Sequence, residues 1–213
     1  LLISLIFNAI ASIYFAKKIY IKYVKNNHFE KVNYRDDKGG KQEDKITYFL
    51  NRDELFESLD IEPNSIIFLG NSLTQNFELG EFFANYKIKN RGINGDIVKG
   101  ILNRLNPIIK ANPDKIFIEI GINDLGRGKS KDTVIYNYKK LIYVLKTKLP
   151  KTKLFIQSIF PTELQSKEMP SYCGKHVNAN IVEINKELLR LSKNGDYTFI
   201  DTHSFFVLNG QLN

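Results

Sequence analysis

The sequence has very few of the residues that build disulfides and metal centres. Its 213 residues include a single cysteine, Cys173, which excludes an intrachain disulfide and a cysteine-based metal cluster. Its three histidines, His28, His176 and His203, are widely separated and show no spacing typical of a dedicated zinc site. No internal repeat is present. The sequence therefore predicts no cysteine cluster and no dedicated zinc site.

Acidic residues are fewer than basic ones, and the formal net charge is +8. The lysines are scattered without the interleaved aromatic residues typical of nucleic-acid interfaces, so we expect a solvated basic surface and no nucleic-acid partner. The segment GRGKS (126–130) lacks the spacing of a phosphate-binding loop, which argues against nucleotide binding. With 43% hydrophobic residues, the chain is long enough for one globular domain.

The sequence given does not start with methionine, and its first residues are apolar. Residues 1–15 contain only three polar side chains, and lysines follow at positions 17, 18, 22 and 25. This is shorter than the roughly 20 residues that span a membrane. We interpret residues 1–25 as a membrane anchor or signal helix whose start is missing, and the lack of a cleavage site favours an uncleaved anchor. The alternative is an amphipathic helix packed on the domain. The orientation of an anchor stays open.

A polar linker is predicted over residues 26–43 and a domain over 44–213. Within the domain, short β-rich runs alternate with helical patterns, which indicates a parallel sheet covered on both faces by helices. The predicted strands are Ser65–Leu69, Tyr86–Lys89, Lys115–Ile120, Lys153–Ser158 and Tyr197–Asp201. The predicted helices are Arg52–Leu59, Ile97–Lys110, Lys131–Leu149 and Asn178–Ser192.

Polar and glycine-rich motifs follow these strands, at the sheet edge where α/β proteins bind ligands. The first strand runs into Gly70-Asn71-Ser72-Leu73-Thr74, the second into NRGINGD (90–96) and the third into GIND (121–124). Alone, the first motif fits a strand-to-helix turn with a capping residue, or a serine presented as a nucleophile. Acyl transfer needs a nucleophile and donors for the oxyanion of the tetrahedral intermediate, and these motifs contain both.

In these three ordered motifs, residues from about 65 to 213 resemble the SGNH hydrolases, which are GDSL-type esterases and lipases. The resemblance is greater to the branch of acetylhydrolase-like proteins and carbohydrate O-acetylesterases. It implies that Ser72 is the nucleophile and that Gly95 and Asn123 join Ser72 in the oxyanion hole. It also implies a flavodoxin-like three-layer α/β/α fold with a five-stranded parallel sheet in the order 2-1-3-4-5, preceded here by the N-terminal hydrophobic helix.

Two positions depart from the family pattern. Asn71 replaces the usual Asp, a mild change because Asn forms similar hydrogen bonds without the charge. The final D-x-x-H block, which supplies the general base and its orienting carboxylate, is not recognised. Asp201 and His203 are spaced D-x-H, and we interpret His203 as a side chain at the end of a strand near the surface. The general base is therefore expected after Asn213, which makes the sequence a C-terminally incomplete fragment.

Other polar residues receive structural interpretations. Asp124 is expected to cap a turn or a helix start. Glu119 lies in an apolar strand and would need a partner, for which a nearby lysine is the candidate. His176 is expected in an exposed loop after the fourth strand.

The resemblance implies a serine esterase that hydrolyses small acyl esters, with acetyl favoured, of a carbohydrate or lipid, without a metal or organic cofactor. It also suggests a membrane-anchored or exported protein that faces outward in a bacterial cell envelope. Two alternatives are kept. One is a non-catalytic, membrane-tethered ligand-binding module, and the other is a tethered scaffold that binds an anionic polymer through its lysines. Substrate identity and oligomeric state do not follow from these residues.

Overall fold

The computed structural model describes residues 41–84, 86–165, 167, 170–208 and 211–212. The chain divides into two compact units, residues 1–51 and 52–213. Of the first unit, only the start of helix α2 (Lys41–Ser58) is described, and this helix begins inside the segment assigned as a linker. The predicted anchor lies outside the described residues. Within the described ranges, no helix has both the length and the apolar character needed to cross a bilayer.

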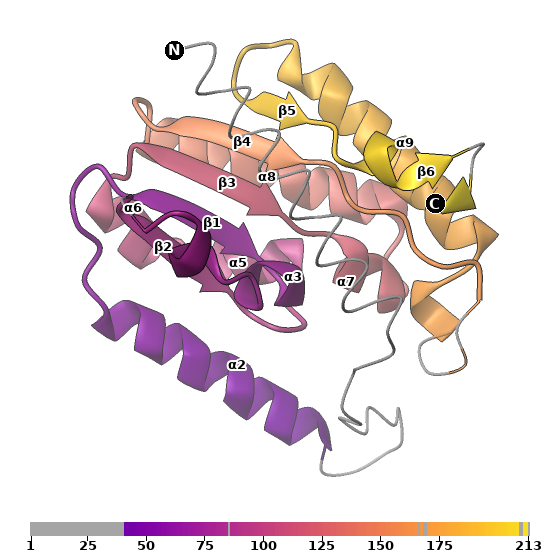
Figure 1. Ribbon diagram of the computed structural model, residues 1–213, viewed down its shortest axis with the longest axis horizontal. Helices are drawn as coiled ribbons and strands as arrows, with labels where there is room; N and C mark the ends of the chain where they lie inside the picture. Colours follow the sequence, from indigo (N-terminus) through magenta and orange to yellow (C-terminus); the bar gives the residue numbers. More distant parts are fainter. Residues whose placement is uncertain (1–40, 85, 166, 168–169, 209–210, 213) are drawn as a thin grey trace. The chain divides into compact units, whose positions relative to one another are not determined.

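The second unit is built on a five-stranded parallel sheet (Figure 1). The strand order β2-β1-β3-β4-β5 confirms the predicted fold class and topology. The register places Gly70 of β1 opposite Gly92 of β2 and Glu119 of β3, so these three strands end at the same level. The strands are β1 (Ile66–Gly70), β2 (Ile88–Gly92), β3 (Lys115–Glu119), β4 (Lys153–Gln157) and β5 (Thr198–Ile200).

Helices connect the strands, and those predicted over Lys131–Leu149 and Asn178–Ser192 are confirmed as α8 and α9. The connecting helices are α3 (Ser72–Gln75), α4 (Leu79–Phe82), α5 (Val98–Asn103), α6 (Asn106–Ala111), α7 (Ile122–Gly126), α8 (Lys131–Lys148) and α9 (Lys175–Ser192). Short 3-10 turns η2 (Pro170–Tyr172) and η3 (His203–Phe206) follow β4 and β5, and an antiparallel pair, β6 (Val207–Leu208) and β7 (Gln211–Leu212), comes last.

The single helix predicted over Ile97–Lys110 is wrong, because the structure has two helices there, α5 and α6. Pro107 lies in the first turn of α6 and has no amide hydrogen. A continuous helix would lose the hydrogen bond from position 107 and would push the proline ring against the preceding turn. The break leaves Arg104 at the end of α5 with non-helical backbone angles.

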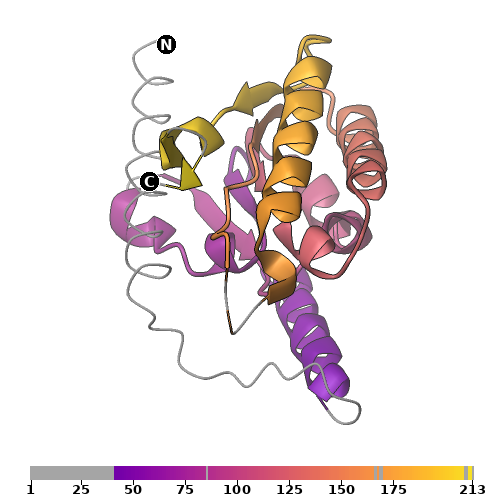
Figure 2. The same cartoon turned by 90° about the vertical axis from the view of Figure 1, so that its right-hand side faces the viewer.

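One face of the sheet carries the main core. Alternate residues of the central strands, such as Ile67, Leu69, Ile116 and Ile118, are fully buried, as expected for side chains two apart on a strand. Helices α5, α6, α8 and α9 supply the facing apolar side chains. Figure 2 shows α8 and α9 lying side by side on one side of the sheet.

The opposite face carries a ladder of aromatic rings. Phe68, Phe117 and Phe155 come from adjacent strands in register, and their rings stack with centroids 4.9 and 4.5 Å apart. Phe77 and Phe83, from the β1–β2 connection, contact Phe68 at 6.3 and 6.4 Å. The α3–α4 connection therefore lies on the face opposite to α8 and α9, which gives three layers.

Candidate active site

Ser72 is the first residue of α3, directly after β1. Asn71 caps this helix, and its side-chain Oδ1 accepts a hydrogen bond of 2.9 Å from the Leu73 backbone N–H. This confirms that Asn replaces the usual Asp without losing the turn. Ser72 itself is half-buried, at the sheet edge where it was expected. Its backbone N–H belongs to the start of a helix, where amide hydrogens lack intrahelical partners.

Asn90 of β2 holds the Ser72 loop in place, a role that the sequence did not reveal. Its Nδ2 donates to the carbonyl oxygens of Thr74 at 2.7 Å and Phe77 at 3.1 Å. Its Oδ1 accepts from the Gly92 N–H at 2.9 Å. A polar side chain in a β-rich run, two residues before a glycine, was the available signal. The asparagine thereby fixes the Ser72 loop against the second strand.

Gly95 lies in the loop that follows β2, with a φ of +76° that favours glycine. The side-chain oxygen of Gln75 accepts a hydrogen bond from the Asn94 N–H at 2.8 Å, so helix α3 is tied to this loop. Arg127, an exposed residue after α7, donates to the Gly95 carbonyl at 2.5 Å. The carbonyl of Gly95 is thus occupied by an arginine of the third loop, and the peptide is fixed in orientation.

Asn123 is buried near the start of α7. Its Nδ2 donates to the backbone carbonyl of Asp96 at 2.9 Å, so the structure brings Asn123 next to the residue that follows Gly95. An amide nitrogen has two hydrogens, so one remains for a ligand. The side chain is held by a buried hydrogen bond, which suits it to a preorganised donor.

Asp124 acts as a cap, but of a different helix from its own. Its Oδ2 accepts from the N–H of Val98, the first residue of α5, at 3.1 Å. The residue that caps the start of α7 is instead Gly121, with a φ of +122° and no side-chain hydrogen bond to the helix. Burial raises the pKa of the Asp124 carboxyl to about 6. Asp124 therefore links the second and third loops, as Asn123 does.

Glu119 is buried at the end of β3, and neither carboxyl oxygen has a hydrogen-bond partner among the described residues. The expected pairing with a lysine is wrong. Burial raises the pKa of Glu119 to about 8, so the neutral form needs no cation at neutral pH.

The three loops thus meet at the carboxyl edge of three adjacent strands. Neighbouring strands lie about 5 Å apart, so the loops after β2 and β3 flank the one that carries Ser72. Ser72 offers a hydroxyl, and Ser72, Gly95 and Asn123 offer N–H groups. This is the set of groups that acyl transfer needs.

His203 does not join this set. It begins the 3-10 turn η3 and does not continue a strand, because β5 ends at Ile200. Its backbone N–H donates to Ser158 Oγ at 2.7 Å, and burial lowers the pKa of its ring. Three strand spacings, roughly 14 Å, separate β1 from β5. Within the described ranges, no histidine or carboxylate side chain hydrogen bonds to Ser72.

His176 was expected in a loop, but it lies in the first turn of α9, where it is exposed. Ser72, Gly95 and Asn123 lie in the loops after β1, β2 and β3, as the sequence suggested. The contacts of Asn90 and Arg127 and the capping of α5 by Asp124 became visible only in the folded chain.

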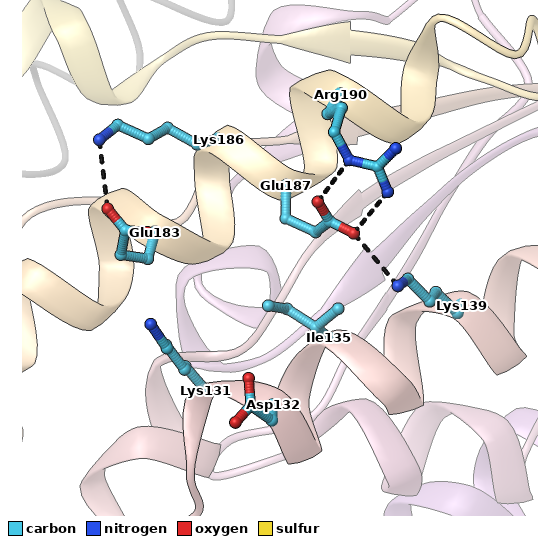
Figure 3. A pocket seen from close by; sticks show the side chains of 8 residues that line it. All are labelled: Lys131, Asp132, Ile135, Lys139, Glu183, Lys186, Glu187 and Arg190. Carbon is cyan, nitrogen blue, oxygen red and sulfur yellow. Dashed lines mark hydrogen bonds and ion pairs between the residues drawn. The ribbon is translucent and has the colours of Figure 1, made fainter.

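A surface groove of about 390 Å³ lies elsewhere, between α8 and α9 (Figure 3). Its charges are largely paired: Glu187 accepts from Arg190 at 2.7 and 2.8 Å and pairs with Lys139 at 3.1 Å. Lys186 pairs with Glu183 at 3.2 Å. The Lys139–Glu187 pair joins α8 to α9, whereas the other two pairs lie within α9, and the groove offers no nucleophile. No group of three or more potential metal ligands occurs among the described residues.

The curated relatives are N-acylneuraminate cytidylyltransferases of Streptococcus agalactiae, 28% identical over 172 residues. The match covers 81% of this chain and only 37% of those relatives. Among solved structures, a GDSL-like lipase from Bacteroides thetaiotaomicron is 19% identical, with a TM-score of 0.67 and coverage of 78% and 83% of the two chains. A variant of an acetyl-xylooligosaccharide esterase from a Geobacillus species is 18% identical, with a TM-score of 0.53 and coverage of 68% and 80%.

The structural likenesses establish the fold. Residues 68–212 also match the model of the GDSL-like lipase/acylhydrolase family, and this range contains all three loops of the site. The match covers well over half of the sequence, so the chain belongs to the GDSL-like lipase/acylhydrolase family.

Proposed function

We propose that the chain is a serine esterase that removes small acyl groups, with acetyl preferred, from a carbohydrate or lipid. The observation that carries the proposal is the meeting of the Ser72, Gly95 and Asn123 loops at one sheet edge, where Asn123 is bonded to the Asp96 carbonyl at 2.9 Å. Membership of an acylhydrolase family fits this chemistry.

In the proposed mechanism, Ser72 Oγ attacks the ester carbonyl carbon, and the alcohol leaves to give an acyl-Ser72 intermediate. The carbonyl oxygen becomes an oxyanion that accepts hydrogen bonds from the N–H groups of Ser72 and Gly95 and from the Asn123 amide. Water then attacks the acyl-enzyme and releases the acid. A general base takes the Ser72 proton and passes it to the leaving alcohol, and the position of His203 beyond β5 argues against its serving in that role.

A sugar ester is the favoured substrate. One solved relative of this fold is an acetyl-xylooligosaccharide esterase, and the curated relatives act, by name, on an N-acylated acidic sugar. A lipid ester remains the other candidate.

Membrane attachment through residues 1–25 is part of the proposal, and fractionation of cells that express the chain with and without these residues tests it.

The test is hydrolysis of p-nitrophenyl acetate, butyrate and octanoate, followed by acetate release from acetylated sugars. We expect the acetate ester to be hydrolysed fastest and Ser72→Ala to abolish turnover while the thermal unfolding temperature stays near the wild-type value. Full activity of Ser72→Ala would refute the assignment. The alternative, a ligand-binding module, predicts binding of an acetylated sugar without hydrolysis.

A further inference from the structure

Asp96 and Arg104 form a buried ion pair behind the candidate site. The guanidinium Nε and Nη2 lie 2.9 and 2.8 Å from Asp96 Oδ2, and both side chains are 1% exposed. Asp96 directly follows Gly95, whereas Arg104 lies at the end of α5, where the helix breaks before Pro107. The pair therefore fastens the Gly95 loop to the interior.

Arg104 also bonds to the strand that leads to the nucleophile. Its Nη2 lies 3.3 Å from the carbonyl oxygen of Gly70, two residues before Ser72. The same carbonyl accepts the backbone N–H of Ile93, from the second loop, at 3.1 Å. One guanidinium thus contacts both the end of β1 and the loop that carries Gly95.

Asp96 extends the connection to the third loop. Its carboxylate accepts from the Ile97 N–H at 2.8 Å and from Arg104, while its backbone carbonyl accepts from Asn123 Nδ2 at 2.9 Å. The pair therefore contacts Asn123 through Asp96, directly follows Gly95 in the chain, and reaches the end of β1, two residues before Ser72, through Arg104.

The fold leaves room for this carboxylate. Gly100 lies on the first turns of α5, and a Cβ at that position would lie 1.9 Å from Asp96 Oδ1. Only a glycine there lets the carboxylate pack against the helix. Burial raises the pKa of Asp96, and the guanidinium of Arg104 opposes this effect. A buried ion pair is weak evidence for stability, since well-packed apolar side chains often replace one at no cost. The positions that the Asp96–Arg104 pair fixes explain its presence better than a contribution to stability does.

We propose that Asp96 and Arg104 are positioning residues that hold the N–H donors of Gly95 and Asn123 in register with Ser72. This inference rests on the proposed esterase function. Neither residue contacts the substrate, and both act through Gly70 and the Asn123 amide. A displacement of about 1 Å at a catalytic group costs on the order of 100-fold in rate, so loosening this pair affects the transition state more than substrate binding.

Arg104→Lys and Asp96→Asn are the informative variants. Lysine keeps the positive charge but has one nitrogen in place of the planar fork, so it cannot reproduce the contacts to both Gly70 and Asp96. Asparagine keeps an acceptor for the Ile97 N–H but loses the ion pair. Ile108→Val, a one-carbon truncation in the same buried region, is the matched control for a general loss of packing.

Two measurements are made on each folded variant, well below its unfolding temperature. With p-nitrophenyl acetate, we expect kcat of Arg104→Lys and Asp96→Asn to fall at least about tenfold with KM within about twofold, and Ile108→Val to keep both constants. By NMR, we expect the Asn123 side-chain amide and the Ile97 N–H to exchange with solvent at least about tenfold faster in the two variants and at the wild-type rate in the control.

Wild-type kcat and wild-type exchange in Arg104→Lys would overturn the inference. An equal loss in Ile108→Val would overturn it too, because the pair would then matter only for packing. If Ser72→Ala hydrolyses p-nitrophenyl acetate as fast as the wild type, the proposed function fails, and the exchange of the Asn123 amide still decides whether the pair holds this loop. If Asp96→Asn does not fold, Arg104→Lys decides alone.

Discussion

Replacing Glu119 by glutamine should make the protein more stable at pH 8 and leave its stability at pH 4 nearly unchanged. The carboxyl is buried without a partner among the described residues, and its pKa rises from 4.5 to about 8 on folding. Below pH 4.5 the group is mostly protonated in both states, so its ionisation does not change the free energy of unfolding. Above this pH the unfolded chain ionises while the folded chain keeps the proton, so stability is lost as pH rises to about 8.

The magnitude follows from the shift. Each pKa unit corresponds to about 1.4 kcal/mol, so the free energy of unfolding should fall by about 3 kcal/mol by pH 7 and by on the order of 5 kcal/mol above pH 8. Glutamine has nearly the same shape and does not ionise, so Glu119→Gln avoids this loss. At 2–4 °C per kcal/mol for a chain of this size, the variant should unfold roughly 6–12 °C above the wild type at pH 7.

The assay is urea unfolding of the wild type and Glu119→Gln at pH 4, 5, 6, 7 and 8. Asp124 also titrates, with a pKa near 6, but its contribution cancels in the difference between the two proteins. Glu81→Gln, at an exposed position on α4, is the matched control for the substitution itself. A difference for Glu119→Gln that does not change with pH would show that the Glu119 pKa is not raised in the folded protein, and the reasoning would be wrong.

Three further predictions concern the candidate site. Asn123→Ala should stay folded, as judged by circular dichroism, and lose about 10²–10³-fold in kcat for p-nitrophenyl acetate, as for loss of one oxyanion donor; an unchanged kcat would remove Asn123 from the site. Asn90→Ala should lower the free energy of urea unfolding by about 1–3 kcal/mol, since the Thr74 and Phe77 carbonyls each lose one of their donors and the Gly92 N–H loses its acceptor, and an unchanged midpoint would contradict this. His203→Ala should keep kcat within about twofold, because His203 follows β5, which lies three strand spacings, roughly 14 Å, from β1; a large loss would show that His203 is the base.

The positions of the strands and of the three site loops followed from the sequence because each depends on local spacing. Short β-rich runs separated by helical patterns specify a parallel sheet, and the carboxyl ends of its strands share one edge. Ser72, Gly95 and Asn123 could therefore be placed at that edge before any contact was known. Pro107 is also a local signal, because a proline ends or kinks a helix, and it marks the break between α5 and α6.

Tertiary structure alone decided which side chains hold those loops. Arg104 meets the Gly70 carbonyl 34 residues away, and Asp124 caps a helix that starts 26 residues earlier. Such partners depend on strand order, since β1 lies between β2 and β3 although β2 comes between them in the chain. Burial has the same origin: the pKa of Glu119 rises because neighbouring elements remove water from it, and no local pattern around a single glutamate encodes that environment.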